Sequence, residues 1–216
     1  MDIDPRFAWS PEGASRLNRR AIPDIPVTDQ DGRRLNFYTD LARGRLLMIA
    51  FTSIRHDAHY PCTPRLAQVR AHLDRGPAAM AELYTITLDP VKDDAAAWSA
   101  YARAAGAGRG WRFLRASADD VEALRGALFV HRARDENAAR VMRRRDAILG
   151  LRPERAVMDC SLGLLRYGDE GRDIWGGAPV RADARAIADR LEWLVSACAS
   201  RPAGRRRAGP AAQIVA

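Results

Sequence analysis

The middle of the chain alternates between short apolar runs and segments with a helical period. Residues 45–51 form a run that is apolar after its first position, and residues 82–88 are rich in β-branched and aromatic side chains. Such runs are typical of strands buried on both faces of a parallel sheet. After the first run, Leu66, Val69 and Leu73 recur with helical spacing. The pattern therefore predicts a strand, a helix and a second strand.

The flanking segments extend this order. Residues 22–35 predict a β-hairpin that turns at Asp31-Gly32, since glycine supplies the positive φ of such a turn. The other predicted elements are a helix over 93–105, a strand over 111–114, a helix capped by Ser117, an antiparallel strand pair over 155–159 and 162–167, and a last helix over 181–199. The predicted fold class is α/β: a thioredoxin-like fold with a central mixed sheet flanked by helices and an N-terminal β-hairpin.

The length of 216 residues suits one domain. We place that domain at residues 21–199, between an irregular arm over 1–20 and a basic tail over 200–216 that is predicted to be disordered. Residues 132–150 are charged and show no core face, which indicates an insertion or a mobile loop.

Charge and cysteine content narrow the class of protein. The formal net charge is +8, but nearly all the basic residues are arginine and Lys92 is the single lysine, a bias typical of genomic base composition. We therefore expect no nucleic-acid partner. There is no membrane span and no signal peptide in the chain as written, which would make it soluble and cytoplasmic. The three cysteines form no disulfide framework and leave the redox compartment open.

The loop between the first strand and the first helix, within residues 49–66, carries the candidate chemistry. His56, His59 and Cys62 offer two nitrogen ligands and one sulfur ligand within seven residues, a spacing compatible with a metal site. Cys62 also stands where the helix should begin, and a helix N-terminus stabilises a thiolate. We expect Cys62 to be a metal ligand or a redox-active nucleophile, or else an inert buried thiol.

Several motifs in the same order resemble the SCO/SenC family of thioredoxin-fold copper proteins. They are Pro23-Asp24, Thr28-Asp29-Gln30-Asp31-Gly32, Phe51-Thr52, Thr87-Leu88-Asp89-Pro90 with Asp93, Gly110-Trp111-Arg112-Phe113-Leu114 and Ala156-Val157-Met158-Asp159. The resemblance spans roughly residues 22 to 195 and implies a copper chaperone or a thiol-redox protein. It also implies a partner in a terminal oxidase copper subunit or another redox protein, and work outside the cytoplasmic membrane.

The family's copper ligands carry over only in part. Family members bind copper through two cysteines on the loop after the first central strand and a histidine before the closing hairpin; these soft ligands suit Cu(I). Cys62 matches the second cysteine, and His56 stands where the first belongs. No histidine occurs around residues 150–154. The resemblance therefore implies a degenerate copper site with Cys62 and His56, to which the spacing of the loop adds His59.

Two alternatives stay open beside this interpretation. One is a non-catalytic interaction domain that has lost metal binding, and a role other than catalysis is favoured overall. The other is a thiol peroxidase, because Pro61-Cys62-Thr63 resembles the cysteine turn of peroxiredoxins, with Arg152 or Arg155 as the assisting arginine. Against the peroxidase, Arg55 and His59 replace that family's upstream proline and threonine.

The other reactive side chains have simpler interpretations. Packing or surface positions are expected for Cys160, Cys198, His72 and His131, while turn formation and helix capping are expected for Asp89 and Asp93. A disulfide between Cys62 and Cys160 depends on a Cα distance that sequence does not give.

Overall fold

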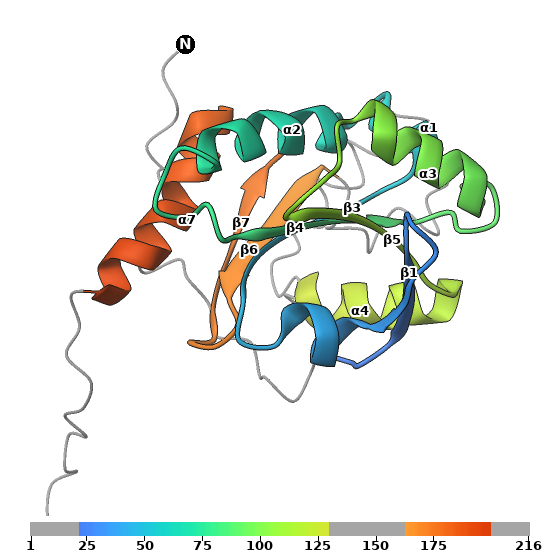
Figure 1. The fold of residues 1–216 in the computed structure, drawn as a ribbon, viewed down its shortest axis with the longest axis horizontal. Helices are drawn as coiled ribbons and strands as arrows, with labels where there is room; N and C mark the ends of the chain where they lie inside the picture. Colours follow the sequence, from blue (N-terminus) through green and yellow to red (C-terminus); the bar gives the residue numbers. More distant parts are fainter. Residues whose placement is uncertain (1–21, 130–162, 200–216) are drawn as a thin grey trace, which may run out of the picture.

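The centre of the molecule is a seven-stranded sheet in the order β2-β1-β5-β4-β3-β6-β7. The structure is a computed structural model and describes residues 22–129 and 163–199 (Figure 1). The strands are β1 (Pro26–Asp29), β2 (Arg34–Asn36), β3 (Leu46–Thr52), β4 (Glu82–Thr87), β5 (Trp111–Arg115), β6 (Leu164–Asp169) and β7 (Ile174–Pro179). The helices are the π-helical turn η4 (Phe37–Ala42), α1 (Ile54–Asp57), α2 (Cys62–Leu73), α3 (Ala95–Ala104), α4 (Ala118–Phe129) and α7 (Ala184–Ala199).

The sheet is mixed, as its sequence pattern predicts. Strands β3, β4 and β5 are parallel neighbours, and the helices α2 and α3 make the crossovers between them. Strand β1 runs antiparallel to β5, and β6 runs antiparallel to β3. All seven residues of β3 are buried, which explains why its sequence is a continuous apolar run rather than an alternating one.

Helices cover both faces of this sheet. In Figure 1, α2, α3 and α7 lie on one side, and α4 lies with η4 on the other. The first face buries the predicted helix residues Leu66, Val69 and Leu73 together with Trp98. The second face holds Phe37 and Leu41 of η4 and Val121, Leu124 and Leu128 of α4. The loop between β3 and α2 therefore joins a fully buried strand to a helix that packs one face on the sheet.

The end of the sheet differs from the sequence prediction. The sequence pattern predicts that residues 162–167 pair with residues 155–159. This prediction is wrong, because the two neighbours of β6 in the sheet are β3 and β7. Strand β7 escaped prediction because Gly176, Gly177 and Pro179 are poor strand formers. Their strand geometry comes from pairing with β6. Residues 155–159 themselves lie outside the described part of the chain.

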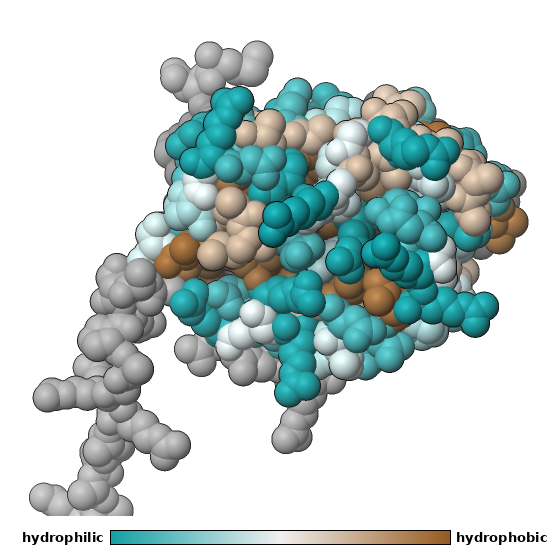
Figure 2. Space-filling model, viewed as in Figure 1, coloured by the Kyte–Doolittle hydropathy of each residue, from teal (hydrophilic) through white to brown (hydrophobic). Residues whose placement is uncertain are grey.

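The remaining predictions about chain organisation concern residues that the structure does not describe: the arm over 1–20, the charged segment 132–150 and the tail over 200–216. Among the described residues, no helix is long and apolar enough to cross a membrane. Figure 2 shows hydrophilic side chains projecting over the middle of one face of the molecule, with smaller apolar areas between them.

Candidate functional site

The candidate site begins where β3 ends. Ser53 follows the last strand residue and caps the one-turn helix α1, with its Oγ accepting a hydrogen bond from the backbone N–H of His56. The same hydroxyl lies 2.9 Å from Nδ1 of His56. The serine thus holds the histidine against the start of its own helix through both the backbone N–H and Nδ1.

Asp57, the last residue of α1, is the centre of the polar contacts here. Its side chain belongs to a residue that is 5% exposed, and it accepts the backbone N–H of Thr63 at 3.0 Å. The phenol of Tyr101, on α3, also donates to this carboxylate. Asp57 therefore satisfies a free N–H in the first turn of α2 and ties that turn to α3.

Cys62 is the first residue of α2, as its position in the sequence predicts, but it is not a thiolate. The residue is fully buried, and burial raises the pKa of its thiol to about 12, with a further upward contribution from the negative charge of Asp57. A backbone hydrogen bond from Gly163 acts in the opposite direction. The expectation that the helix N-terminus stabilises a thiolate is wrong here, because desolvation outweighs the favourable amide groups.

The cover over the thiol comes from a distant part of the chain. Gly163, just before β6, donates its N–H to Cys62 and has a φ of 74°, a conformation that glycine adopts without strain. A Cβ at this position would lie 2.7 Å from Cδ1 of Tyr60, so the tyrosine ring packs directly on the glycine. Tyr60 is itself buried and belongs to the same apolar cluster as Cys62.

A second carboxylate, that of Asp93, forms hydrogen bonds at the start of the loop that follows β3. Asp93 is buried and accepts hydrogen bonds from Oγ1 of Thr87 at 2.6 Å and from the backbone N–H of Ile54 at 3.3 Å. Helix capping was expected of Asp93, and that expectation is wrong, because the N-cap of α3 is Asp94. Asp93 instead links the end of β4 to the start of α1.

The three predicted metal ligands do not share an environment. Cys62 is buried, His56 is half-buried with Nδ1 against Ser53, and His59 is exposed to solvent. Among residues 22–129 and 163–199, no group of three or more His, Cys, Asp or Glu side chains is placed to hold a metal ion. In the conformation described, the residues do not fit a preformed copper site, although Cys62 supplies a thiol at the position that the family comparison implies.

Other predicted site residues lie elsewhere or outside the described chain. Arg152, Arg155, Cys160 and His131 lie outside the described residues, as does the side chain of Cys198. His72 is half-buried on α2, which agrees with a packing or surface role. Sequence analysis missed Asp57 and the role of Tyr101. The one available signal was an aspartate shortly before a predicted helix start, which is also common in ordinary loops.

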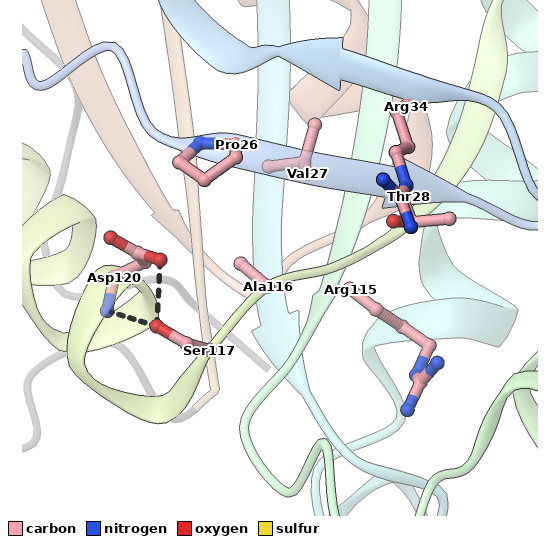
Figure 3. Close-up of a pocket in the computed structure, with 8 residues that line it drawn as sticks. All are labelled: Pro26, Val27, Thr28, Arg34, Arg115, Ala116, Ser117 and Asp120. Atoms are coloured by element: carbon pink, nitrogen blue, oxygen red, sulfur yellow. Dashed lines mark hydrogen bonds between the residues drawn. The ribbon is translucent and has the colours of Figure 1, made fainter.

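A shallow pocket of about 380 Å³ lies near β1, β5 and the start of α4. Figure 3 shows that Arg115 points away from the pair formed by Ser117 and Asp120, whose hydroxyl and carboxylate are hydrogen-bonded at 2.6 Å. The Arg115 guanidinium donates to the backbone oxygens of Pro90 and Asp93. Ser117 and Asp120 are thus paired with each other, and Arg115 stabilises the β4–α3 loop through its backbone oxygens.

Comparison with solved structures identifies the architecture. No protein-family model and no curated protein matches the chain. Yeast Sco1 with copper bound has a TM-score of 0.56 and 14% identity, over 90% of this chain and 98% of that one. A SCO1/SenC family lipoprotein from Bacillus anthracis has a TM-score of 0.57 and 13% identity, over 84% and 96%. The chain has the Sco fold.

This result confirms the predicted thioredoxin-like fold of SCO/SenC type. The Sco-fold structures include BsSco, described as a cytochrome c oxidase assembly protein with a disulfide switch, at a TM-score of 0.57 and 12% identity over 85% of this chain and 96% of that one. Others, from Arabidopsis thaliana and Bradyrhizobium japonicum, also contain copper. At these identities the match establishes the fold, and the chemistry has to be argued from the residues present.

Proposed function

We propose that this chain handles copper, as a Cu(I) carrier or as a thiol reductant, in the assembly of a respiratory oxidase. The observation that carries the proposal is the position of Cys62: a thiol at the first residue of α2, after β3, in a fold shared with copper-bound Sco structures over nearly their whole length. A soft sulfur ligand suits Cu(I). We propose as its partner the copper subunit of a terminal oxidase or another redox protein; this is supported by BsSco, which has the same fold and is described as a cytochrome c oxidase assembly protein.

The protonated state of Cys62 determines how such a protein would work. A thiol has to lose its proton to bind Cu(I), and burial holds the pKa of Cys62 at about 12. Copper uptake would therefore release a proton and become tighter as the pH rises. Of the two histidines on the loop, His59 is nearer to Cys62 in sequence and is exposed, whereas His56 directly precedes Asp57, whose carboxylate accepts the N–H of Thr63.

The second candidate is a partner-binding domain that has lost metal binding. It is supported by the Asp57 carboxylate, which already caps α2, and by the separation of exposed His59 from buried Cys62. On this hypothesis Cys62 is a packing residue, and the Sco fold contributes a recognition surface. Its partner class stays the same, but no copper is carried.

Anaerobic Cu(I) titration in competition with a chromophoric chelator distinguishes the two. We expect the wild type to take up one Cu(I) with an affinity that rises with pH. Cys62→Ser should lose this binding, and His56→Ala and His59→Ala should weaken it. Cys198→Ser and His72→Ala are the matched controls for loss of a thiol and of an imidazole. Wild-type binding no tighter than that of Cys62→Ser would refute copper handling and leave the partner-binding domain.

The thiol peroxidase is the weakest of the hypotheses. A thiolate is the nucleophile that attacks peroxide, and the raised pKa of Cys62 opposes its formation. Consumption of hydrogen peroxide with a thiol reductant, compared between the wild type and Cys62→Ser, tests this directly. We expect equal rates in the two proteins.

The compartment of the protein is a further part of this proposal. One Sco-fold structure is described as a lipoprotein, and we infer that this chain too works outside the cytoplasmic membrane. Immunodetection of the full-length product in cell fractions tests this inference. Recovery only with the cytoplasmic fraction would contradict it.

A further inference from the structure

A polar pocket of about 570 Å³ lies at the end of the sheet opposite to Cys62. It is lined by the β1–β2 turn, the first residue of β4 (Glu82), the second half of α3, the loop after α3 and the start of β5. Because β3, β4 and β5 are parallel, their first residues lie at one edge of the sheet. The Cys62 loop follows the last residue of β3, at the other edge. The pocket is therefore separate from the candidate copper site.

Four arginines line this pocket, and we call it the arginine pocket. They are Arg33 on the β1–β2 turn, Arg103 on α3, Arg109 on the following loop and Arg112 on β5. Within the described residues, none of these guanidinium groups forms an ion pair with a carboxylate. Among the described residues, Arg103 alone of the four donates a side-chain hydrogen bond, to Oγ of Ser99 at 2.7 Å. Most of their donors are thus available to a ligand.

The carboxylates in the lining have other partners. Asp29 is buried, and its Oδ1 accepts the backbone N–H groups of Asp31 and Arg33, both at 2.9 Å. Glu82 lies 3.6 Å from the guanidinium of Arg45, which is not part of the lining. These two acids serve the turn and the neighbouring strand. Asp31, the third acid in the lining, is exposed, and its Oδ2 accepts a hydrogen bond from Nε2 of Gln30 at 3.5 Å. In the part of the chain that the structure describes, none of the three acids forms an ion pair with the four arginines, which come from the turn, α3, the following loop and β5 and line one space.

We propose that the arginine pocket binds an anion that carries two or more carboxylate or phosphate groups. A planar guanidinium offers paired donors that match the oxygens of a carboxylate or phosphate. Donors from separate segments converge on a ligand with more than one such group. The pocket volume falls in the range of small-molecule sites, which favours a free anion over a long peptide. This site extends beyond copper handling and does not depend on it.

Isothermal titration with three probes tests the proposal on the full chain at constant ionic strength: citrate, pyrophosphate and a hexaglutamate peptide. The test variant is Arg33→Gln/Arg109→Gln, because both side chains are exposed and come from different segments. The control is Arg75→Gln/Arg181→Gln, which removes the same charge from exposed positions outside the pocket. Circular dichroism and melting temperature check that both variants fold.

We expect the wild type and the control to bind the same probe with similar affinity, and the test variant to bind it about tenfold or more weakly. Binding of citrate or pyrophosphate without hexaglutamate assigns a free small anion. Binding of hexaglutamate alone assigns an acidic segment of a partner protein as the source of the same chemistry. Equal weakening in both variants, or no binding of any probe by the wild type, would overturn the arginine pocket as an anion site.

Discussion

The carboxylate of Asp57 accepts the backbone N–H of Thr63 at 3.0 Å, directly beside the buried thiol of Cys62. The contact caps α2 from a residue that precedes the helix, and the Tyr101 phenol holds the same carboxylate from α3. One negative charge thus has two effects. It stabilises the start of α2, and it raises the pKa of the neighbouring thiol.

Asp57→Asn should separate these two effects. The amide oxygen still accepts the Thr63 N–H, but the negative charge is gone, so the pKa of Cys62 should fall and alkylation at pH 8 should become faster. Weaker capping should also lower the free energy of unfolding by about 1 kcal/mol. Both quantities are measured in a background with Cys160→Ser and Cys198→Ser. Asp74→Asn, an exposed position after α2, is the control. Unchanged alkylation in Asp57→Asn would show that the charge does not affect the thiol.

Stability should depend on pH through Cys62. In the folded protein burial raises the pKa of this thiol to about 12, whereas in the unfolded chain it ionises near the ordinary value of 9.0. The unfolded form loses its proton first, so the stabilisation from the neutral thiol is complete below pH 9.0 and declines as the pH rises toward 12. Urea unfolding of the wild type and Cys62→Ala at pH 7 and 10.5 should show a smaller difference at the higher pH. Cys198→Ala is the control, and a difference independent of pH would count against a buried neutral Cys62.

The position of Cys62 could be predicted from the sequence, but its chemical state could not. The apolar run of β3 and the spacing of Leu66 and Val69 place the thiol at a helix start, because both are local patterns. Its surroundings include Tyr60, in the same apolar cluster, and the N–H of Gly163, about a hundred residues further along the chain. Helix-terminus electrostatics, taken alone, therefore gave the wrong direction for the thiol pKa.

The fold, too, could be predicted only where local sequence patterns determine it. The parallel strands were predictable because they are rich in apolar, β-branched and aromatic residues, whereas β7 contains Gly176, Gly177 and Pro179 and is a strand only through its pairing with β6. In the site, Asp57 was missed because its second partner, Tyr101, comes from α3. Local sequence patterns identify which element carries a residue. They do not reveal contacts made across elements.

Asp93 and Asp94 are neighbours with different expected effects on stability. Asp93→Ala leaves the donors of Thr87 and Ile54 unpaired in a buried place and should cost about 2 to 3 kcal/mol. Asp94→Ala removes an exposed helix cap on Ala97 N–H and should cost about 1 kcal/mol. Urea unfolding of the two variants measures the difference. If Asp94→Ala proved equally or more destabilising, the link from β4 to α1 through Asp93 would not hold.

Gly163 and Gly106 form a matched pair for testing the cover over the thiol. Both have positive φ angles, 74° and 75°, so an alanine at either position adopts a strained backbone at a cost of about 1 to 2 kcal/mol. Only at Gly163 would the new Cβ meet another group, Cδ1 of Tyr60 at 2.7 Å. Gly163→Ala should therefore lower the free energy of unfolding more than Gly106→Ala, and it should also speed alkylation of Cys62.

The double variant Gly163→Ala/Tyr60→Ala tests whether the extra loss of stability in Gly163→Ala comes from the collision with the Tyr60 ring. Because removal of the ring removes the collision, the effect of Gly163→Ala should shrink toward that of Gly106→Ala when Tyr60 is already alanine. Faster alkylation of Cys62 in Gly163→Ala would then follow from displacement of the tyrosine, since Tyr60 packs in the same apolar cluster as Cys62 and the glycine N–H donates to the thiol. Equal destabilisation by the two glycine substitutions, with unchanged alkylation, would mean that access to Cys62 is controlled elsewhere.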